Sequence, residues 1–437
     1  MTDPDPRHRI APAGWLFDLA EPAQEARPQS GLSVAALLEE VRHLRSTGIQ
    51  TVETTTRASD GSVAVPVFTN TFWSTRQRDG NALHEVSYRA CFKPALPRFF
   101  IERLCPPGGR VHDPFLGRGT TALEAALLGR IPSGADANPL SRVLLEPRLT
   151  PPTATAVAAR LAELDLDVDA EVLEDLDVFF HPRTLRAIAA LRAHFLHAEA
   201  SGSLDAVDRW LRMVTVNRLT GHSPGFLSVY TMPPNQAVSI ATQRKLNVRR
   251  AQTPPERDLR EIVLRKSRSL LAGCDESVRS RLAAVADHAR FVTGSSARRP
   301  ELEDGSVDLV VTSPPFLDIV QYRADNWLRC WFCGIDPDAA AIAELRRIEA
   351  WMELMTAVLQ DLRRMLKPTG VIAFEVGEVR GGTVRLEEQV LACGVRAGLV
   401  PHAVLVQDHA FTKTANCWGV SNNARGTNTN RVVLLGR

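Results

Sequence analysis

The sequence predicts an α/β protein in which a mainly helical insertion interrupts a doubly wound, Rossmann-like parallel sheet. Two observations indicate the sheet: short apolar runs of strand length end in polar residues, as at 307–312 and 370–377, and helix-forming segments alternate with them. A third observation indicates the insertion. Between residues 147 and 290 the apolar residues follow helical spacing instead.

Composition and charge exclude several classes of protein. The 437 residues are 44% hydrophobic and 23% charged with a net charge of +2, which is typical of an ordinary globular protein of one or two domains. No stretch approaches the roughly 18 apolar residues of a membrane span, and the N-terminus carries no apolar signal core. We therefore expect cytoplasmic residence and no membrane partner.

The seven cysteines are scattered and odd in number, which argues against a disulfide framework. Cys330 and Cys333 form a C-x-x-C pair, but no second pair stands at zinc spacing. The sequence thus favours core packing for both thiols and predicts no metal site.

Residues 1–80 are predicted to form an N-terminal tail with a small extension. The first thirty or so residues are rich in proline and charge and have too few large apolar groups for a packed core. Apolar spacing then predicts a helix from Val34 to Leu44, ended by Gly48, and an irregular strand within 63–73.

Residues 81–146 contain the first βαβ unit of the predicted sheet. A strand ends at Asp113, a turn follows, a helix covers 122–128, and a second strand, 131–136, ends in Asp136. In such a unit the acid at the tip of the second strand is placed to accept both ribose hydroxyls of a nucleoside.

The turn in this unit carries Gly117 and Gly119, which allow a ligand to approach the backbone closely. Thr120 or Thr121 is expected to cap the following helix, whose N-terminus offers free N–H groups to a carboxylate. A lone G-x-G is weak evidence, because a tight turn explains it equally well. The combination with Asp113, Phe115 and the acid of the next strand is more specific.

Residues 147–290 are the predicted helical insertion and the candidate target-recognition region. Helices are expected at 182–197, 204–216 and 258–271, with a candidate functional loop at 217–235. A basic run follows this loop and is a candidate nucleic-acid contact, with a solvated helix face as an equally weighted alternative. The run consists of Arg244, Lys245, Arg249 and Arg250.

Residues 291–437 complete the predicted sheet. Strands are expected at 291–296, 307–311, 370–377, 403–407 and 431–435, and helices at 342–366 and 386–397. The strand at 307–311 is followed by Thr312 and then by Ser313-Pro314-Pro315-Phe316, where two consecutive prolines forbid both helix and ladder pairing.

This tetrapeptide has the groups needed to hold a planar ring that carries an exocyclic amine. The Ser313 hydroxyl and the Pro314 carbonyl can accept hydrogen bonds from the amine, and the Phe316 ring can stack on its face. The alternative for Ser-Pro-Pro taken alone is a surface turn between a strand and a helix.

Taken together, two segments resemble the loops of the DNA amino-methyltransferases that modify cytosine N4 or adenine N6. Asp113-Pro-Phe-Leu-Gly-Arg-Gly-Thr-Thr121 resembles the cofactor loop of that family, and Thr312-Ser-Pro-Pro-Phe316 resembles its catalytic loop, in the Ser form more typical of cytosine N4 enzymes. The resemblance covers residues 84–146 and 291–435. Many members have the catalytic loop first; here the cofactor loop comes first, which leaves the place of target recognition open.

The resemblance implies a class I methyltransferase sheet, S-adenosylmethionine as cofactor, and site-specific methylation of DNA, of the kind found in restriction-modification systems. It implies that the target base is flipped out of the duplex and that no metal is needed. Enzymes that methylate guanine N2 in transfer RNA resemble the same loops, so RNA remains an alternative substrate, and a non-catalytic binding module remains an alternative class. Recognition sequence and oligomeric state stay open.

The resemblance also implies roles for particular residues. Asp113 is expected near the methionine amine, Asp136 at the ribose, and Ser295 or Ser296 at the adenine edge. The expected cofactor-binding residues are Asp113, Phe115, Gly117, Gly119, Thr120, Asp136 and Ser295, and the expected catalytic residues are Ser313, Pro314, Pro315 and Phe316.

Overall fold

The structure is a computed structural model. It describes residues 31–46, 48–74, 79–88, 91–168, 170, 172, 175–231, 237–299, 301–315, 322–336, 347–377, 384–408 and 430–437. The predicted N-terminal tail before residue 31 lies outside these residues.

A nine-stranded sheet in the order β3-β4-β10-β11-β9-β8-β5-β6-β7 forms the centre of the described chain. Strand β11 runs antiparallel between β9 and β10, β3 is antiparallel to β4, and the other neighbours are parallel. This mostly parallel sheet confirms the predicted Rossmann-like class. The bounds are β3 Val52–Arg57, β4 Ala64–Asn70, β5 Arg110–Asp113, β6 Ile131–Asp136, β7 Arg290–Thr293, β8 Val307–Thr312, β9 Leu366–Val376, β10 Val400–Gln407 and β11 Arg431–Gly436.

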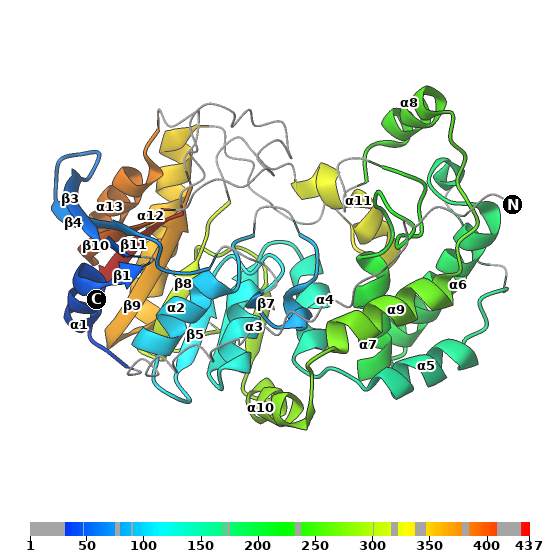
Figure 1. Cartoon of the computed structure of the whole chain (residues 1–437), viewed down its shortest axis with the longest axis horizontal. Coiled ribbons are helices and arrows are strands. Elements are labelled where there is room, and N and C mark those ends of the chain that lie inside the picture. Colours follow the sequence, from blue (N-terminus) through cyan, green and yellow to red (C-terminus); the bar gives the residue numbers. More distant parts are fainter. Residues whose placement is uncertain are drawn as a thin grey trace, which may run out of the picture.

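Helices cover both faces of this sheet because its strands are apolar on both sides. Along β11, Val432 and Leu434 pack with the helices of one face, whereas Val433 and Leu435 pack with those of the other. Figure 1 shows α2 and α3 in front of the strands and α12 with α13 behind them. The bounds are α1 Val34–His43, α2 Ala95–Leu104, α3 Thr120–Leu127, α12 Ile348–Met365 and α13 Leu386–Arg396.

The N-terminal extension contributes more to the sheet than its sequence predicts. Strand β4 pairs in parallel with β10 through the register Val404 to Val67, and β3 adds an outer strand. A separate two-stranded pair, β1 Arg45–Ser46 and β2 Ile49–Gln50, follows α1. The apolar alternation of β3 is weak, because most of its residues are exposed, and this explains why the sequence did not predict it.

Between β6 and β7 the described residues form helices and loops, as the apolar spacing predicts. Helices α5, α6, α7 and α9 pack into one group beside the sheet, on the right in Figure 1, while α10 packs under α3 and β6. The bounds are α4 Leu140–Leu145, η3 Glu146–Arg148, α5 Ala154–Glu163, η4 Leu176–Val178, α6 Pro182–Ala200, α7 Ala206–Val216, α8 Ile240–Arg250, α9 Leu259–Leu271 and α10 Glu276–Ala286.

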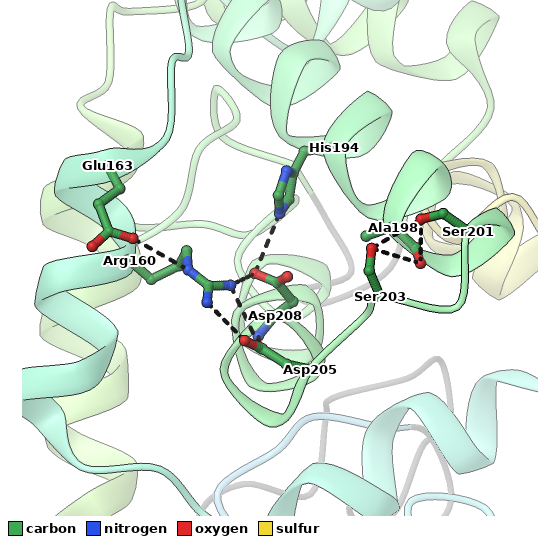
Figure 2. Close-up of polar contacts among 8 residues, drawn as sticks. All are labelled: Arg160, Glu163, His194, Ala198, Ser201, Ser203, Asp205 and Asp208. Atoms are coloured by element: carbon green, nitrogen blue, oxygen red, sulfur yellow. Dashed lines mark hydrogen bonds and ion pairs between the residues drawn. The ribbon is translucent and has the colours of Figure 1, made fainter.

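An ion network joins three of these helices. Arg160 of α5 donates to Asp208 of α7 at 2.5 Å and to Asp205, the N-cap of α7, at 2.7 Å. His194 of α6 lies 3.3 Å from the same Asp208 carboxylate. Figure 2 shows Arg160 and His194 both pointing toward Asp208. The network fixes how α5, α6 and α7 are arranged.

Helix α11, Tyr322–Cys333, links the sheet to the helical group. It follows the loop after β8 and packs against α4, α6 and α7. Its Trp327 indole donates to the Ala237 carbonyl at 3.0 Å. Cys330 and Cys333 are buried, and burial raises the pKa of their thiols to about 11 and about 12, as expected for packed side chains.

Most predicted elements have the predicted type. Helices α5, α10 and α11 were not predicted, and a helix at α8 was predicted only as the alternative for the basic run. Within the described residues, no helix is long and apolar enough to cross a membrane.

Candidate active site

The carboxyl ends of β5 and β8 bring the two predicted loops together. The Thr312 hydroxyl, at the end of β8, donates to Oδ1 of Asp113, at the end of β5, over 2.6 Å. Thr121 donates to the carbonyl of Val311 at 3.0 Å. The cofactor loop and the start of the catalytic loop are therefore held against each other by buried hydrogen bonds, although they lie 199 residues apart along the chain.

The cofactor loop is closed onto the tip of β6 by Asp136. Its carboxylate accepts the Gly117 N–H at 2.7 Å through Oδ2 and the Asn138 N–H at 2.8 Å through Oδ1. Each carboxylate oxygen has a second lone pair, so these bonds leave acceptors for ribose hydroxyls. The geometry fits the predicted ribose role and adds a second role, because Asp136 also shapes the loop.

The glycines of this loop serve its own conformation. Gly117 and Gly119 have positive φ angles of 52° and 74°, which favour glycine. A Cβ on Gly119 would lie 2.6 Å from Cδ1 of the buried Leu145. Gly117 has more room, since the nearest atoms to a Cβ there are 3.6 Å away on Tyr88 and Cys91.

The expected threonine cap of α3 is wrong. The N-cap position of this helix is Gly119, and no side chain caps its N-terminus. The threonine hydroxyls have other partners: Thr120 accepts from Arg118 Nε at 3.1 Å, and Thr121 bonds to β8. The cap was predicted from the local sequence, but the Thr121 hydroxyl bonds to a strand 190 residues away, and the Thr120 hydroxyl bonds to Arg118, two residues before it.

Burial is the main influence on the pKa values of Asp113 and Asp136. The pKa of Asp113 is raised to about 7, mainly by burial, with the nearby Asp136 adding to the rise and the Thr312 hydroxyl and Phe115 N–H opposing it. Burial also raises the pKa of Asp136. A cationic ligand would favour the ionised forms, so the pair suits the ammonium and sulfonium charges of S-adenosylmethionine.

A segment before α2 forms a further wall of this site. Arg118, buried within the cofactor loop, donates to the carbonyls of Val86 at 2.9 Å and Phe92 at 3.3 Å. The Tyr88 hydroxyl accepts from Asn138 Nδ2 at 3.3 Å. No role was predicted for the residues of this segment, because only these contacts show where it lies.

The catalytic loop is described as far as Pro315, whose carbonyl accepts from the Trp351 indole of α12 at 3.2 Å. Ser313 is half-buried and Pro314 is buried. Phe316 lies outside the described residues, so its stacking role stays a prediction.

Glu375 of β9 is a site residue that sequence reasoning missed. Its buried carboxyl group shares a hydrogen bond with the Ser313 side chain and accepts from Asn430 Nδ2 at 2.7 Å. Burial raises its pKa, and the two hydrogen bonds oppose that rise. The sequence carried one signal, an acid inside an otherwise apolar strand.

The two serine candidates for the adenine edge lie in different surroundings. Ser295 is exposed, and its hydroxyl accepts from the Ala297 N–H at 3.2 Å. Ser296 is buried and donates to the carbonyl of Pro114 in the cofactor loop. Both follow β7, whose Gly294 N–H bonds to the Asp136 carbonyl at 2.8 Å, so the segment lies beside the cofactor loop.

The basic run forms an exposed face of α8, away from the two loops in sequence. Arg244 pairs with Asp175 at 2.9 Å, and the Arg250 guanidinium lies 3.9 Å from the centre of the Tyr230 ring. Lys245 and Arg249 are exposed and have no ion pair with any described residue. Two of the four cations are thus engaged within the chain.

The sheet and the acids at its strand tips define the class I methyltransferase fold. Residues 41–139 match the N6_N4_Mtase family model, described as DNA methylase. This match confirms the resemblance to the DNA amino-methyltransferases and supports S-adenosylmethionine as the cofactor. It includes the cofactor loop and ends before the catalytic loop.

A curated relative, the type II methyltransferase M.MvaI of Kocuria varians, is 27% identical over 97 residues, which are 22% of this chain and 20% of that protein. The match thus spans about a fifth of the relative's length. Solved structures give weaker likenesses. TrmN from Thermus thermophilus has a TM-score of 0.30 at 15% identity, covering 83% of this chain and 53% of that one. The rRNA methyltransferase aviRa from Streptomyces viridochromogenes has a TM-score of 0.30 at 12% identity, covering 82% and 90%.

Proposed function

We propose that this chain is an S-adenosylmethionine-dependent methyltransferase that modifies the exocyclic amine of a base in DNA, with cytosine N4 as the target atom. The observation that carries the proposal is the hydrogen bond between Thr312 and Asp113. It joins the loop expected to hold the cofactor to the loop expected to hold the base. The Ser form of the catalytic loop favours cytosine N4 over adenine N6.

Ser313 has the geometry to orient the target amine. A hydroxyl has one donor and two acceptor lone pairs. If the Ser313 hydroxyl donates to the Glu375 carboxylate, both lone pairs remain free to accept the N–H groups of the amine. Asn430 donates to the same carboxylate, which favours the acceptor form of Glu375.

In the proposed reaction the protein acts by positioning the target amine against the methyl group of the cofactor. When bound, S-adenosylmethionine supplies an electrophilic methyl group on a sulfonium. The amine of a nucleobase is a poor nucleophile because its lone pair is delocalised into the ring. Acceptors at Ser313 and at the Pro314 carbonyl favour a more tetrahedral nitrogen with its lone pair directed at the methyl group.

Asp113, Phe115, Gly117, Gly119, Thr120, Asp136 and Ser295 are proposed to hold the cofactor. Residues 81–146 and 291–437 are proposed to form the catalytic domain, with 1–80 as an extension. Residues 147–290 are proposed to recognise the target, and their exposed α8 face is proposed to contact nucleic-acid phosphates. Support for the last point is the excess of exposed positive charge at Lys245 and Arg249.

The test is methyl transfer from labelled cofactor to duplex DNA and, in parallel, to transfer RNA. We expect label in DNA and a large loss with Ser313→Ala. Label in transfer RNA alone would reassign the substrate, and no label in either would favour the non-catalytic alternative.

A further inference from the structure

A cluster of cations lies where the helical group meets the segment before α2. Lys266 of α9 has a side chain that is 13% exposed, and its Nζ lies 3.4 Å from Oε2 of Glu85. Arg218 follows α7, and its charge acts on Lys266 and on Glu85. We name Arg218, Lys266 and Glu85 the interlobe cluster.

Arg218 is held in place without a carboxylate partner. Its guanidinium lies 4.1 Å from the centre of the Phe226 ring, and its Nε donates to the Asn217 carbonyl at 2.7 Å. In the part of the chain that the structure describes, no carboxylate lies within ion-pair distance of it, and its two terminal nitrogens make no hydrogen bond. Stacking on an aromatic ring leaves the edge of a guanidinium available for a planar or tetrahedral anion.

Positive charge is in excess at this cluster. The pKa of Arg218 is lowered to about 10 by burial first and then by the charges of Arg329 and Arg265. Burial and the charge of Arg218 also lower the pKa of Lys266. Glu85 is the acid that opposes both shifts, and 41% of its side chain is exposed. A desolvated excess of cations is stabilised by an external anion.

The cluster adjoins the cofactor loop. Asn217, the residue before Arg218, accepts the Ser87 N–H at 2.9 Å through its side chain. The next residue, Tyr88, lies beside Gly117 of the cofactor loop. An anion at the cluster would therefore lie near the loop that is expected to hold the cofactor.

We propose that Arg218 and Lys266 bind a backbone phosphate of the nucleic-acid substrate close to the target nucleotide, with Glu85 competing for the same cations. The inference rests on the proposed function, because it takes the anion to be part of that substrate. A phosphodiester accepts a guanidinium edge and an ammonium together, which matches the two cations of the cluster.

The test removes the two positive charges in one variant and the negative charge of Glu85 in another, and compares how each binds nucleic acid. Fluorescence anisotropy measures binding of duplex DNA, single-stranded DNA and transfer RNA over a range of salt concentrations. The double variant Arg218→Ala/Lys266→Ala should bind roughly tenfold more weakly, and its slope of log affinity against log salt should be lower by about one unit. Glu85→Gln should bind more tightly than the wild type, because it removes the competing carboxylate.

Removing any acid strengthens attraction to a polyanion, so Glu256→Gln, which removes one acid from the exposed pair with Arg183, is the matched control and should tighten binding less than Glu85→Gln. Arg218→Lys keeps the charge and should retain the slope even where Arg218→Ala folds poorly. Arg183→Ala is the control: Arg183 is 76% exposed on α6, 3.5 Å from Glu256, and its removal should change the slope less.

Unchanged slopes in the double variant, or weaker binding by Glu85→Gln, would overturn the inference while leaving the proposed function standing if methyl transfer continues. Absence of binding by the wild type to all three nucleic acids would overturn both. The nucleic acid that binds most tightly among the three identifies whether the phosphate belongs to DNA or RNA.

Discussion

The Thr312 hydroxyl donates a 2.6 Å hydrogen bond to the buried carboxyl group of Asp113. This bond joins the ends of β8 and β5, and with them the loops that we assign to the base and to the cofactor. It also opposes the rise in the Asp113 pKa that burial causes.

Thr312→Val removes this hydrogen bond, since valine keeps the shape of threonine and lacks the hydroxyl. We expect a loss of roughly 1 to 3 kcal/mol in the free energy of unfolding, because a buried carboxyl oxygen loses its partner. Cofactor affinity should fall as well. Thr312→Ser, which restores the hydroxyl, should recover both quantities in thermal unfolding and calorimetry; equal losses in the two variants would contradict this role.

Cofactor binding should depend on pH through Asp113, whose pKa is about 7. A cationic ligand favours the carboxylate, so affinity should be full above about pH 7 and fall by up to about tenfold per unit below it. Calorimetry across this range tests the effect. Asp113→Asn should bind weakly with a flatter profile; a wild-type affinity independent of pH would show that Asp113 does not face the cofactor.

The same shift should affect the ligand-free protein in the opposite direction. A carboxyl group whose folded pKa is raised binds more protons when folded than when unfolded, so its contribution to stability is present below about pH 4 and is lost as pH rises through 7. Denaturant unfolding without cofactor should therefore show less loss of stability over this range in Asp113→Asn than in the wild type.

Gly119→Ala should destabilise the fold itself. The substitution places a methyl group against Leu145 at 2.6 Å and also imposes a positive φ on alanine. Gly129→Ala is the matched control, since its φ is 72° and its nearest neighbour is 4.0 Å away. We expect Gly119→Ala to lose roughly 1 to 3 kcal/mol more than the control, by overpacking. Equal losses in urea unfolding would mean that the clash is relieved at no cost.

Ser313→Ala should slow methyl transfer by about ten- to a hundredfold, as expected for losing one orienting hydrogen bond of roughly 1 to 3 kcal/mol, while cofactor binding stays intact. Glu375→Gln should slow it less. If Glu375 acts by orienting Ser313, the double variant should be no slower than Ser313→Ala alone. Additive losses in single-turnover rates would assign Glu375 a separate role.

The face of α8 should contribute to nucleic-acid binding mainly through its two unpaired cations. Lys245→Ala/Arg249→Ala should lower the salt slope by about two units if both contact phosphates. Arg244→Ala/Arg250→Ala should lower it less, because Arg244 already pairs with Asp175 and Arg250 lies on Tyr230. Equal slopes for the wild type and both double variants would leave α8 a solvated helix.

Much of the fold could be predicted because its signals are local. An apolar run such as 307–312 and the glycines at 117 and 119 indicate a strand and a turn without any knowledge of their neighbours. The order of the loops along the chain also follows from the sequence. Helix α11 was missed because its burial depends on packing against α4, α6 and α7, which lie far away in sequence. Strand β3 was missed because most of its residues are exposed and give no apolar alternation.

The partners of individual side chains could not be predicted in the same way. The Thr120 hydroxyl had a local role as a predicted cap, yet it accepts a hydrogen bond from Arg118. The Arg118 side chain is itself held by the carbonyls of Val86 and Phe92, which lie 32 and 26 residues earlier in the chain. Glu375 looked like an isolated acid in a strand, and only the approach of Ser313 and Asn430 makes it part of the site.

The most direct measurement is mass spectrometry of the nucleosides released from DNA that has been treated with the protein and S-adenosylmethionine carrying a labelled methyl group. We expect labelled N4-methylcytosine, and strongly reduced label with Ser313→Ala. Label in N6-methyladenine would support the methyltransferase activity and change the target base from cytosine to adenine. If the DNA acquires no methylated amine although the protein binds both cofactor and DNA, the proposed methyltransferase activity is wrong.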